Sequence, residues 1–314
     1  GLRARVMRPG VRSLAALAAL ALAACSNARA PTPEAAVPGL AVKLEAPGAA
    51  PRRVVRFAFV KGARATLDLR LDLQLGVEVD RQRMDIPPLP GLAVRVTVTI
   101  AEVLADGSAR WSAEFARATA IASPGVAPET VAALTAALPT DKTFTATGVV
   151  TPRGALREAA LAAPGVVAPE AAQFLDAVRQ LLHQMACPLP AEPIGVGARW
   201  EVRTELDNDG MKLTHIATNE VVAMRDGQLE LKQTVRQEAL PQTVATPQAP
   251  GSTTTLEALA ADGTASVVVD LARPWPATYS LSFQLDTMLA TTSDGQRQAL
   301  GVRMSMLAQA TTVP

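Results

Sequence analysis

The sequence predicts a mostly β protein of the α+β class, in which a large twisted antiparallel sheet packs on one long and one short helix. Three observations predict this fold: a long segment with strand periodicity, five Asp-Gly pairs that lie between strand-like segments, and only two segments with helical character. The same pattern also allows an alternative, a two-sheet β-sandwich with the helix at one edge.

The longest regular segment, 66–79, alternates apolar and polar residues. Leucine, and then valine, recurs at every second position, and most of the residues between them are charged or polar. In a helix these apolar side chains would spread around the whole circumference, whereas in a strand they share one face. We therefore predict a strand in which Leu69, Leu71 and Leu73 face the core.

Shorter segments on both sides have strand character, and Asp-Gly pairs separate many of them. Strands are predicted over 54–60, 94–100, 109–115, 144–150, 155–160, 200–206, 211–224, 228–238, 253–259, 265–271, 278–289 and 297–308. The Asp-Gly pairs occupy 106–107, 209–210, 226–227, 262–263 and 294–295. Type I′ turns favour this dipeptide because both central residues need positive φ. Each pair is therefore predicted to be a hairpin turn.

Two segments begin with the same helix entrance, Val-Ala-Pro-Glu, at 126–129 and 167–170. Proline suits the first helical position, and glutamate is favoured beside a helix N-terminus. A short helix is expected over 128–138. A longer one, over 169–186, places its apolar residues within an arc of about 140° and is expected to bury that side.

The amino-terminal segment, 1–24, has the organisation of a secretory signal. Arginines precede an apolar run, 14–24, which is too short to span a bilayer. The run ends in Leu-Ala-Ala before Cys25, and this ending resembles the lipobox of bacterial lipoproteins. The resemblance implies that lipid is attached to Cys25 and that the chain is cleaved before it. The alternative is an ordinary signal cleaved near Ala24, followed by an incidental cysteine.

The segments after the signal suggest a tether and one domain. Residues 25–51 are rich in proline and alanine without usable periodicity, so a tether is predicted. Residues 52–314 are predicted to be one β-rich domain, with 52–165 and 190–314 as halves of a distant duplication. Ser26 follows the lipidated position, and lipoproteins without aspartate there generally go to the outer membrane of Gram-negative cells. The lipobox thus implies a lipid-anchored protein of the cell envelope, in the outer membrane if the cell is Gram-negative.

A second resemblance lies in the segment LPAEPIGVGARW, which ends at Trp200. It is similar to a segment in a family of secreted bacterial lipoproteins of unknown function, and that family supplies no catalytic residues. In physical terms, the prolines end the helix and Trp200 is expected in the core at the head of the next strand. The predicted sheet over a helix is similar only in architecture to lipoprotein-carrier-like lipid-binding proteins.

Composition and the absence of motifs narrow the function classes. Removal of 1–24 deletes four arginines and no acidic residue, so the formal net charge changes from +1 to −3, and no nucleic-acid partner is predicted. His183 and His215 lack further ligands at metal spacing, so both are expected to be solvated, with no metal and no cofactor. Cys187 is expected to be a small buried residue. No nucleophile, dinucleotide or phosphate motif is found, so no enzyme is predicted.

The sequence therefore predicts an envelope lipoprotein, held to the membrane through Cys25, that binds a lipid or another apolar or amphipathic ligand. A wide sheet of small aliphatic side chains, with one long helix to cover it, leaves room for such a ligand. The residues expected to face the ligand are Leu69, Leu71, Leu73, Phe174, Val178 and Leu182. The alternative is a structural or protein-interacting envelope lipoprotein without a ligand.

Overall fold

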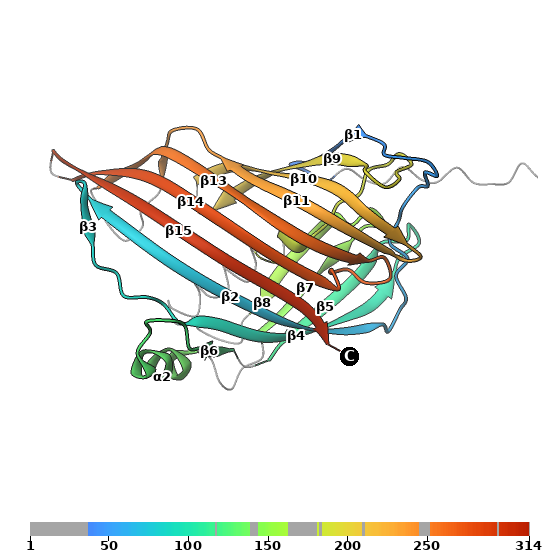
Figure 1. The fold of residues 1–314 in the computed structure, drawn as a ribbon, viewed down its shortest axis with the longest axis horizontal. Coiled ribbons are helices and arrows are strands. Elements are labelled where there is room, and N and C mark those ends of the chain that lie inside the picture. The colour runs from blue at the N-terminus through green and yellow to red at the C-terminus, as the bar shows by residue number, and fades with distance from the viewer. Residues whose placement is uncertain are drawn as a thin grey trace, which may run out of the picture. The chain divides into compact units, whose positions relative to one another are not determined.

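The computed structural model describes residues 37–314 apart from 117, 139–143, 163–180, 182–183, 209–210, 245–251, 294 and 314. The described residues form one large antiparallel sheet of 15 strands (Figure 1). The helix α2, Pro128–Ala137, is the one helix that the structure describes from end to end. The predicted mostly β fold is therefore confirmed. The predicted long helix, 169–186, lies largely outside the described residues.

The strands are β1 Leu40–Ala46, β2 Arg64–Val79, β3 Gln82–Met84, β4 Gly91–Val103, β5 Ala109–Phe115, β6 Thr119–Ile121, β7 Phe144–Val150, β8 Leu156–Ala162, β9 Arg199–Asn208, β10 Met211–Arg225, β11 Gln228–Glu238, β12 Gln242–Val244, β13 Thr253–Asp270, β14 Thr278–Ser293 and β15 Gln296–Val313. Their order across the sheet is β1-β9-β10-β11-β13-β14-β15-β2-β4-β5-β7-β8. The short strands β12, β3 and β6 pair with β13, β2 and β4. Because all 15 described strands belong to one sheet, the alternative of a two-sheet sandwich is wrong.

The long strand β2 confirms the interpretation of its alternating sequence. Leu67 and Leu69 are buried, with 3% and 4% of their surface exposed, on what we call the inner face of the sheet. Leu71 is half-buried on the same face and packs against the core. On the outer face, the exposed Arg70 pairs with Asp72 at 2.9 Å. The strand period therefore separates the core from solvent as expected.

Two of the five Asp-Gly pairs, 106–107 and 226–227, and the glycine of a third, Gly295, have the expected place between strands. Gly107, Gly227 and Gly295 have φ values of 81°, 76° and 76°, and each lies between two strands that pair with each other. Glycine accepts this conformation without the steric cost that other residues carry. Asp209-Gly210 lies outside the described residues.

The prediction of a turn at Asp262-Gly263 is wrong, because both residues lie inside the continuous strand β13. Gly263 pairs with Val235 of β11 on one side and with Phe283 of β14 on the other. A turn at this point would leave backbone N–H and C=O groups of β11 and β14 without partners. Strand pairing therefore outweighs the preference of the Asp-Gly dipeptide for a turn. A Cβ at Gly263 would lie 2.6 Å from the carbonyl oxygen of Ser282, so close packing gives the glycine another role.

The prediction of a strand over 54–60 is also wrong. The segment lies outside the sheet, and its backbone bonds to loops: the N–H of Phe57 donates to Pro152 O, and that of Ala58 donates to Leu271 O. Its alternation still has a structural cause, because Phe57 and Phe59 are buried and their rings stack with centroids 5.5 Å apart. An alternating sequence thus indicates that one side of a segment is buried, but it does not show that the segment belongs to a sheet.

Part of the predicted tether belongs to the sheet. The strand β1 pairs with β9, and Leu40 stands opposite Thr204. The predicted tether, 25–51, therefore does not extend over residues 40–46. The prediction for Trp200 is confirmed, because its side chain is fully buried near the head of β9 and its Nε1 donates to Pro188 O at 2.9 Å.

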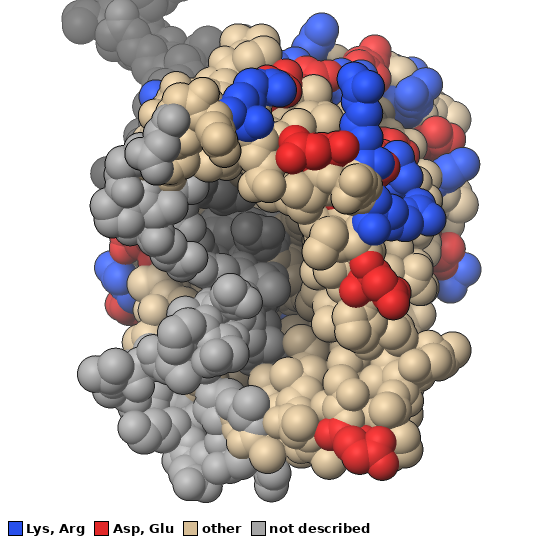
Figure 2. All heavy atoms as spheres, turned by 90° about the vertical axis from the view of Figure 1, so that its left-hand side faces the viewer, with Lys and Arg blue, Asp and Glu red and all other residues tan. Residues whose placement is uncertain are grey.

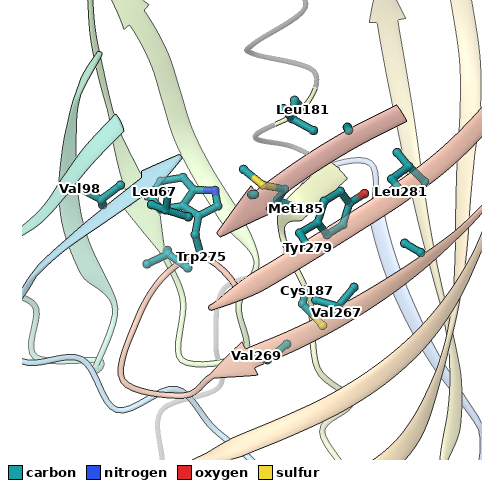
Figure 3. Close-up of a cluster of buried hydrophobic side chains, with 14 of the residues drawn as sticks. Leu67, Val98, Leu181, Met185, Cys187, Val267, Val269, Trp275, Tyr279 and Leu281 are labelled. Atoms are coloured by element: carbon teal, nitrogen blue, oxygen red, sulfur yellow. The ribbon is translucent and has the colours of Figure 1, made fainter. Parts of the chain in front are cut away.

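The sheet curls so that its inner face encloses the hydrophobic core (Figure 1). Figure 3 shows Trp275 beside Leu67 and Val98, and Met185 beside Tyr279. The ring of Trp275 also meets Trp111 of β5 edge to face, with centroids 4.4 Å apart. These contacts join segments that lie far apart in the sequence. No helix in the described part of the chain is long and apolar enough to cross a membrane.

Candidate functional site

A cavity of about 330 Å³ lies on the inner face of the curled sheet, and both edge strands, β1 and β8, contribute to its lining. Leu40 of β1 and Leu156 of β8 both line it. The other described lining residues are Val37, Pro38, Gln184, Ala186, Pro188, Val202, Thr204, Glu205, Leu206, Asp207, His215, Ala217, Asn219, Gln233 and Gln237. The volume falls at the lower end of the range of about 300 to 1,000 Å³ that is usual for small-molecule sites.

The register of β10 and β11 places two polar pairs on one wall of this cavity. His215 stands opposite Gln237, and Asn219 stands opposite Gln233. Between these pairs lies an apolar one, Ala217 with its β11 partner, and Val202 of β9 continues that row. Residues four apart in a strand share a face at a separation of roughly 13 Å. The wall is therefore apolar in the middle and polar at both ends.

Burial keeps His215, in the first polar pair, in its neutral form. The ring is 9% exposed, and this burial lowers its pKa to about 4. The side-chain Nε2 of Gln237 lies 3.3 Å from Nδ1 of His215. An amide nitrogen can only donate, so Nδ1 accepts and the ring proton resides on Nε2. The expectation that His215 is solvated is therefore wrong, because alternation along β10 turns this residue inward.

In the second polar pair, only part of the hydrogen-bonding capacity of the side chains is used. Asn219 and Gln233 are 1% and 4% exposed, and Nε2 of Gln233 donates to Oδ1 of Asn219 at 3.0 Å. The other amide atom of Gln233, Oε1, is buried without a hydrogen-bond partner. Gln184 has the same defect, because its Oε1 is also buried without a partner. Seven buried side-chain nitrogen or oxygen atoms of the described residues lack a partner, and these two belong to residues that line one cavity, where a ligand or water can supply the donor.

On the neighbouring strand β13, the residues opposite this wall of β11 are small. Ala261 stands opposite Gln237, Gly263 opposite Val235, and Ala265 opposite Gln233. Small side chains on β13 leave space beside the longer side chains of β11. The charged residues of the described lining, Glu205 and Asp207, are exposed. Charge therefore lies at the rim, and the interior of the wall carries neutral groups.

Figure 2 shows one end of the curled sheet, the end at which β3 lies in Figure 1. The surface is hollowed there, and the described residues that border the hollow are mostly uncharged. Lysine, arginine and acidic residues gather on the outer surface instead. On the inner face of β2, Leu73 is half-buried and Leu75 is 39% exposed. Apolar surface thus continues beyond the buried core.

The residues predicted to face a ligand are distributed differently. Leu69, Leu71 and Leu73 lie on the inner face of β2 and do not belong to the described lining of the cavity. As ligand-facing residues they stay predictions. Phe174, Val178, Leu182 and the lipidation site Cys25 lie outside the described residues. Cys187 is buried, as predicted, and its burial raises the pKa of its thiol to about 12.

The polar pairs of the cavity did not emerge from the sequence, although a signal was present. In β10, His215 and Asn219 occupy positions that alternate with Leu213, Ala217 and Val221. In β11, Gln233 and Gln237 alternate with leucines and a valine in the same way. Polar residues at inward positions of a strand were the available clue. Their meeting in pairs depended on the register, which the sequence left open.

Comparison of the chain with protein-family models, with curated proteins and with solved structures gives no match. Within the described part of the chain, no group of three or more His, Cys, Asp or Glu residues is placed to hold a metal ion. The functional interpretation therefore rests on the geometry of the cavity.

Proposed function

We propose that this protein is a lipid-anchored lipoprotein of the cell envelope that binds an amphipathic ligand on the inner face of its sheet. The observation that carries the proposal is the cavity of about 330 Å³, whose wall combines apolar residues with buried, neutral polar pairs. Sites for small molecules typically pair an apolar lining with a few polar groups that orient the ligand.

An amphipathic ligand fits both parts of this surface. Val202 and Ala217 offer apolar contact in the middle of the wall, and the apolar inner face continues to Leu75. The amide and imidazole groups at the ends of the wall offer hydrogen bonds. A wholly apolar ligand would leave the buried amide oxygen of Gln233 unpaired, at a cost of about 1–3 kcal/mol.

The anchor is the second part of the proposal. The apolar run before Cys25 and the lipobox-like ending support attachment of lipid to its sulfur. Cys25 lies 15 residues before Leu40, where β1 begins, so a short segment separates the proposed anchor from the sheet. The proposed place is the cell envelope, in the outer membrane if the cell is Gram-negative.

We propose a binding role and not an enzymatic one. Within the described part of the chain, the ring of His215 pairs with the amide of Gln237 and with no acidic residue of the kind that orients a catalytic base. A protein-interacting role is a second candidate, because a hollow of about 200 Å³ on the outer face is lined by Gly76, Met288 and Gly301. Met288 is 44% exposed, and such apolar exposure is common at protein contacts.

The test fills the cavity. Ala217 is 6% exposed on the cavity wall, so Ala217→Trp in the full chain is expected to abolish binding of the neutral apolar dye Nile red and to lower the amount of co-purified lipid. The matched control is Ala41→Trp, on the exposed side of β1, which is expected to leave both unchanged. Fluorescence titration and lipid extraction measure the outcome. A wild-type protein that binds neither dye nor lipid would contradict the proposal and favour the protein-interacting role.

A further inference from the structure

The unpartnered atoms of the cavity constrain the chemistry of its ligand. The amide oxygen Oε1 of Gln233 is buried, and the Nε2 of the same side chain is already engaged with Asn219. A buried acceptor without a donor is costly, and most buried polar atoms of native proteins have a partner. The site therefore lacks a hydrogen-bond donor at this position.

A second acceptor with the same need lines the cavity from another element. Gln184 belongs to the segment that leads to Pro188, and its Oε1 is also buried without a donor. The two glutamines come from segments almost fifty residues apart, and both line one cavity. A ligand with more than one donor group would satisfy both.

The same lining also supplies a donor. Because Nδ1 of His215 accepts from Gln237, its Nε2 carries the proton and can donate. A hydroxyl group donates and accepts at once, so hydroxyls match a wall with two free acceptors and one donor. A carboxylate or phosphate brings no such donors, and the charged residues of the described lining, Glu205 and Asp207, would repel it.

A cationic head group is a weaker match. An ammonium group brings donors, but it would be buried beside Val202 and Ala217 while the carboxylates stay at the exposed rim. Burial of a charge without a close partner is far more costly than burial of a neutral hydroxyl. The interior of the wall therefore favours an uncharged head.

We propose that the cavity receives the uncharged, hydroxyl-bearing head group of a lipid such as a monoacylglycerol, and that its chain runs along the apolar inner face. This inference rests on the proposed ligand-binding function and names the class of ligand. About 330 Å³ suits a head of glycerol size with the first part of a chain.

The experiment compares four ligands with the same ten-carbon chain. Monodecanoylglycerol, methyl decanoate, decanoate and decylamine are each titrated against Nile red bound to the full-chain protein, and displacement of the dye gives the affinity of each ligand. We expect monodecanoylglycerol to bind about tenfold more tightly than methyl decanoate, because its hydroxyls satisfy buried acceptors that the ester leaves unpaired. It should also bind more tightly than either charged ligand.

A variant of a cavity residue tests whether the preference for monodecanoylglycerol over methyl decanoate arises in the cavity. Gln184→Met keeps the length of the side chain and removes one unpaired oxygen without breaking a hydrogen bond to another described residue, so the tenfold preference should shrink. Gln284→Met, on the exposed side of β14, is the matched control and should keep the preference. Thermal unfolding of each variant shows that it is folded, and the ligand series on the wild type does not depend on any variant.

The outcomes separate this inference from the proposed function. If the four ligands bind alike, or if decanoate or decylamine binds most tightly, the head-group inference is overturned and the binding function stands. If Nile red and all four ligands fail to bind, both are overturned. Tight binding of monodecanoylglycerol, with a preference that Gln184→Met reduces and Gln284→Met keeps, supports the inference.

Discussion

At the scale of single residues, the inward-facing polar side chains of β10 and β11 are the least expected feature of the molecule. His215 and Asn219 occupy positions where the alternation calls for apolar side chains. Their partners on β11 satisfy part of their hydrogen-bonding capacity, and the oxygen of Gln233 stays unpaired. Buried polar groups that are only partly satisfied reduce stability, so their presence indicates a use other than folding.

Neutral burial of His215 predicts that stability depends on pH. The pKa of its ring falls from 6.5 in the unfolded chain to about 4 in the folded protein. Between these values the unfolded state binds the proton and the native state does not, so the free energy of unfolding decreases as the pH falls. The contribution is fully present above pH 6.5, and about 3 kcal/mol is lost by pH 4.

Urea unfolding of wild type and His215→Gln at pH 7 and at pH 4.5 tests this prediction. The variant lacks the titrating ring, so it should lose much less stability than the wild type over this interval. Hydrogen-bonded carboxylates with lowered pKa values, such as Asp68 and Asp106, affect both proteins alike and mainly below this range. Equal losses in the two proteins would show that His215 is not held neutral.

At the scale of elements, local patterns predicted strands well and turns less well. The alternating sequence of β2 was sufficient to predict a strand, because a strand with one buried face has a period of two whichever strands lie beside it. The pair Asp262-Gly263 misled, because the local preference of a dipeptide says nothing about strands on either side that need its backbone groups. The segment 54–60 misled for the opposite reason, because its alternation lacked a pairing partner.

The inner face of β2 carries a buried and an exposed leucine, so the same substitution can be compared at two positions of one strand. Leu69 is 4% exposed and Leu75 is 39% exposed, and both point to the same face. Leu69→Ala should lower the free energy of unfolding by about 2–5 kcal/mol, because a buried leucine leaves a cavity. Leu75→Ala should cost less than half as much. Denaturant unfolding of the two variants gives the comparison, and equal costs would mean that Leu75 is as well packed as Leu69.

At the scale of the whole molecule, the two sequence halves occupy separate parts of the sheet. The strands β2, β4, β5, β7 and β8 of the first half are neighbours, as are β9, β10, β11, β13, β14 and β15 of the second. The pairing of β15 with β2 joins them, and the edge-to-face contact of Trp111 with Trp275 joins their cores. No local sequence pattern contains this junction, since it depends on the topology of the complete chain.

The proposed anchor concerns the chain as a whole. If Cys25 carries lipid, the mature protein should partition into the detergent phase, because each buried methylene of an acyl chain contributes about 0.8 kcal/mol. Cys25→Ala should move the protein to the aqueous phase. Cys187→Ala is the control for the other cysteine, which is buried in the core, and should not change partitioning. Wild-type protein found in the aqueous phase would contradict lipidation.

The pairing of β15 with β2 has a consequence for how the protein folds. Val313 stands opposite Thr66, so the two strands are separated by more than 200 residues of chain. Such contacts carry a large loop-closure entropy and slow the search for the native state. The first half of the sheet therefore cannot complete its hydrogen bonding until β15 has been synthesised. Until then β2 exposes an unpaired edge, the kind of surface that chaperones protect from aggregation.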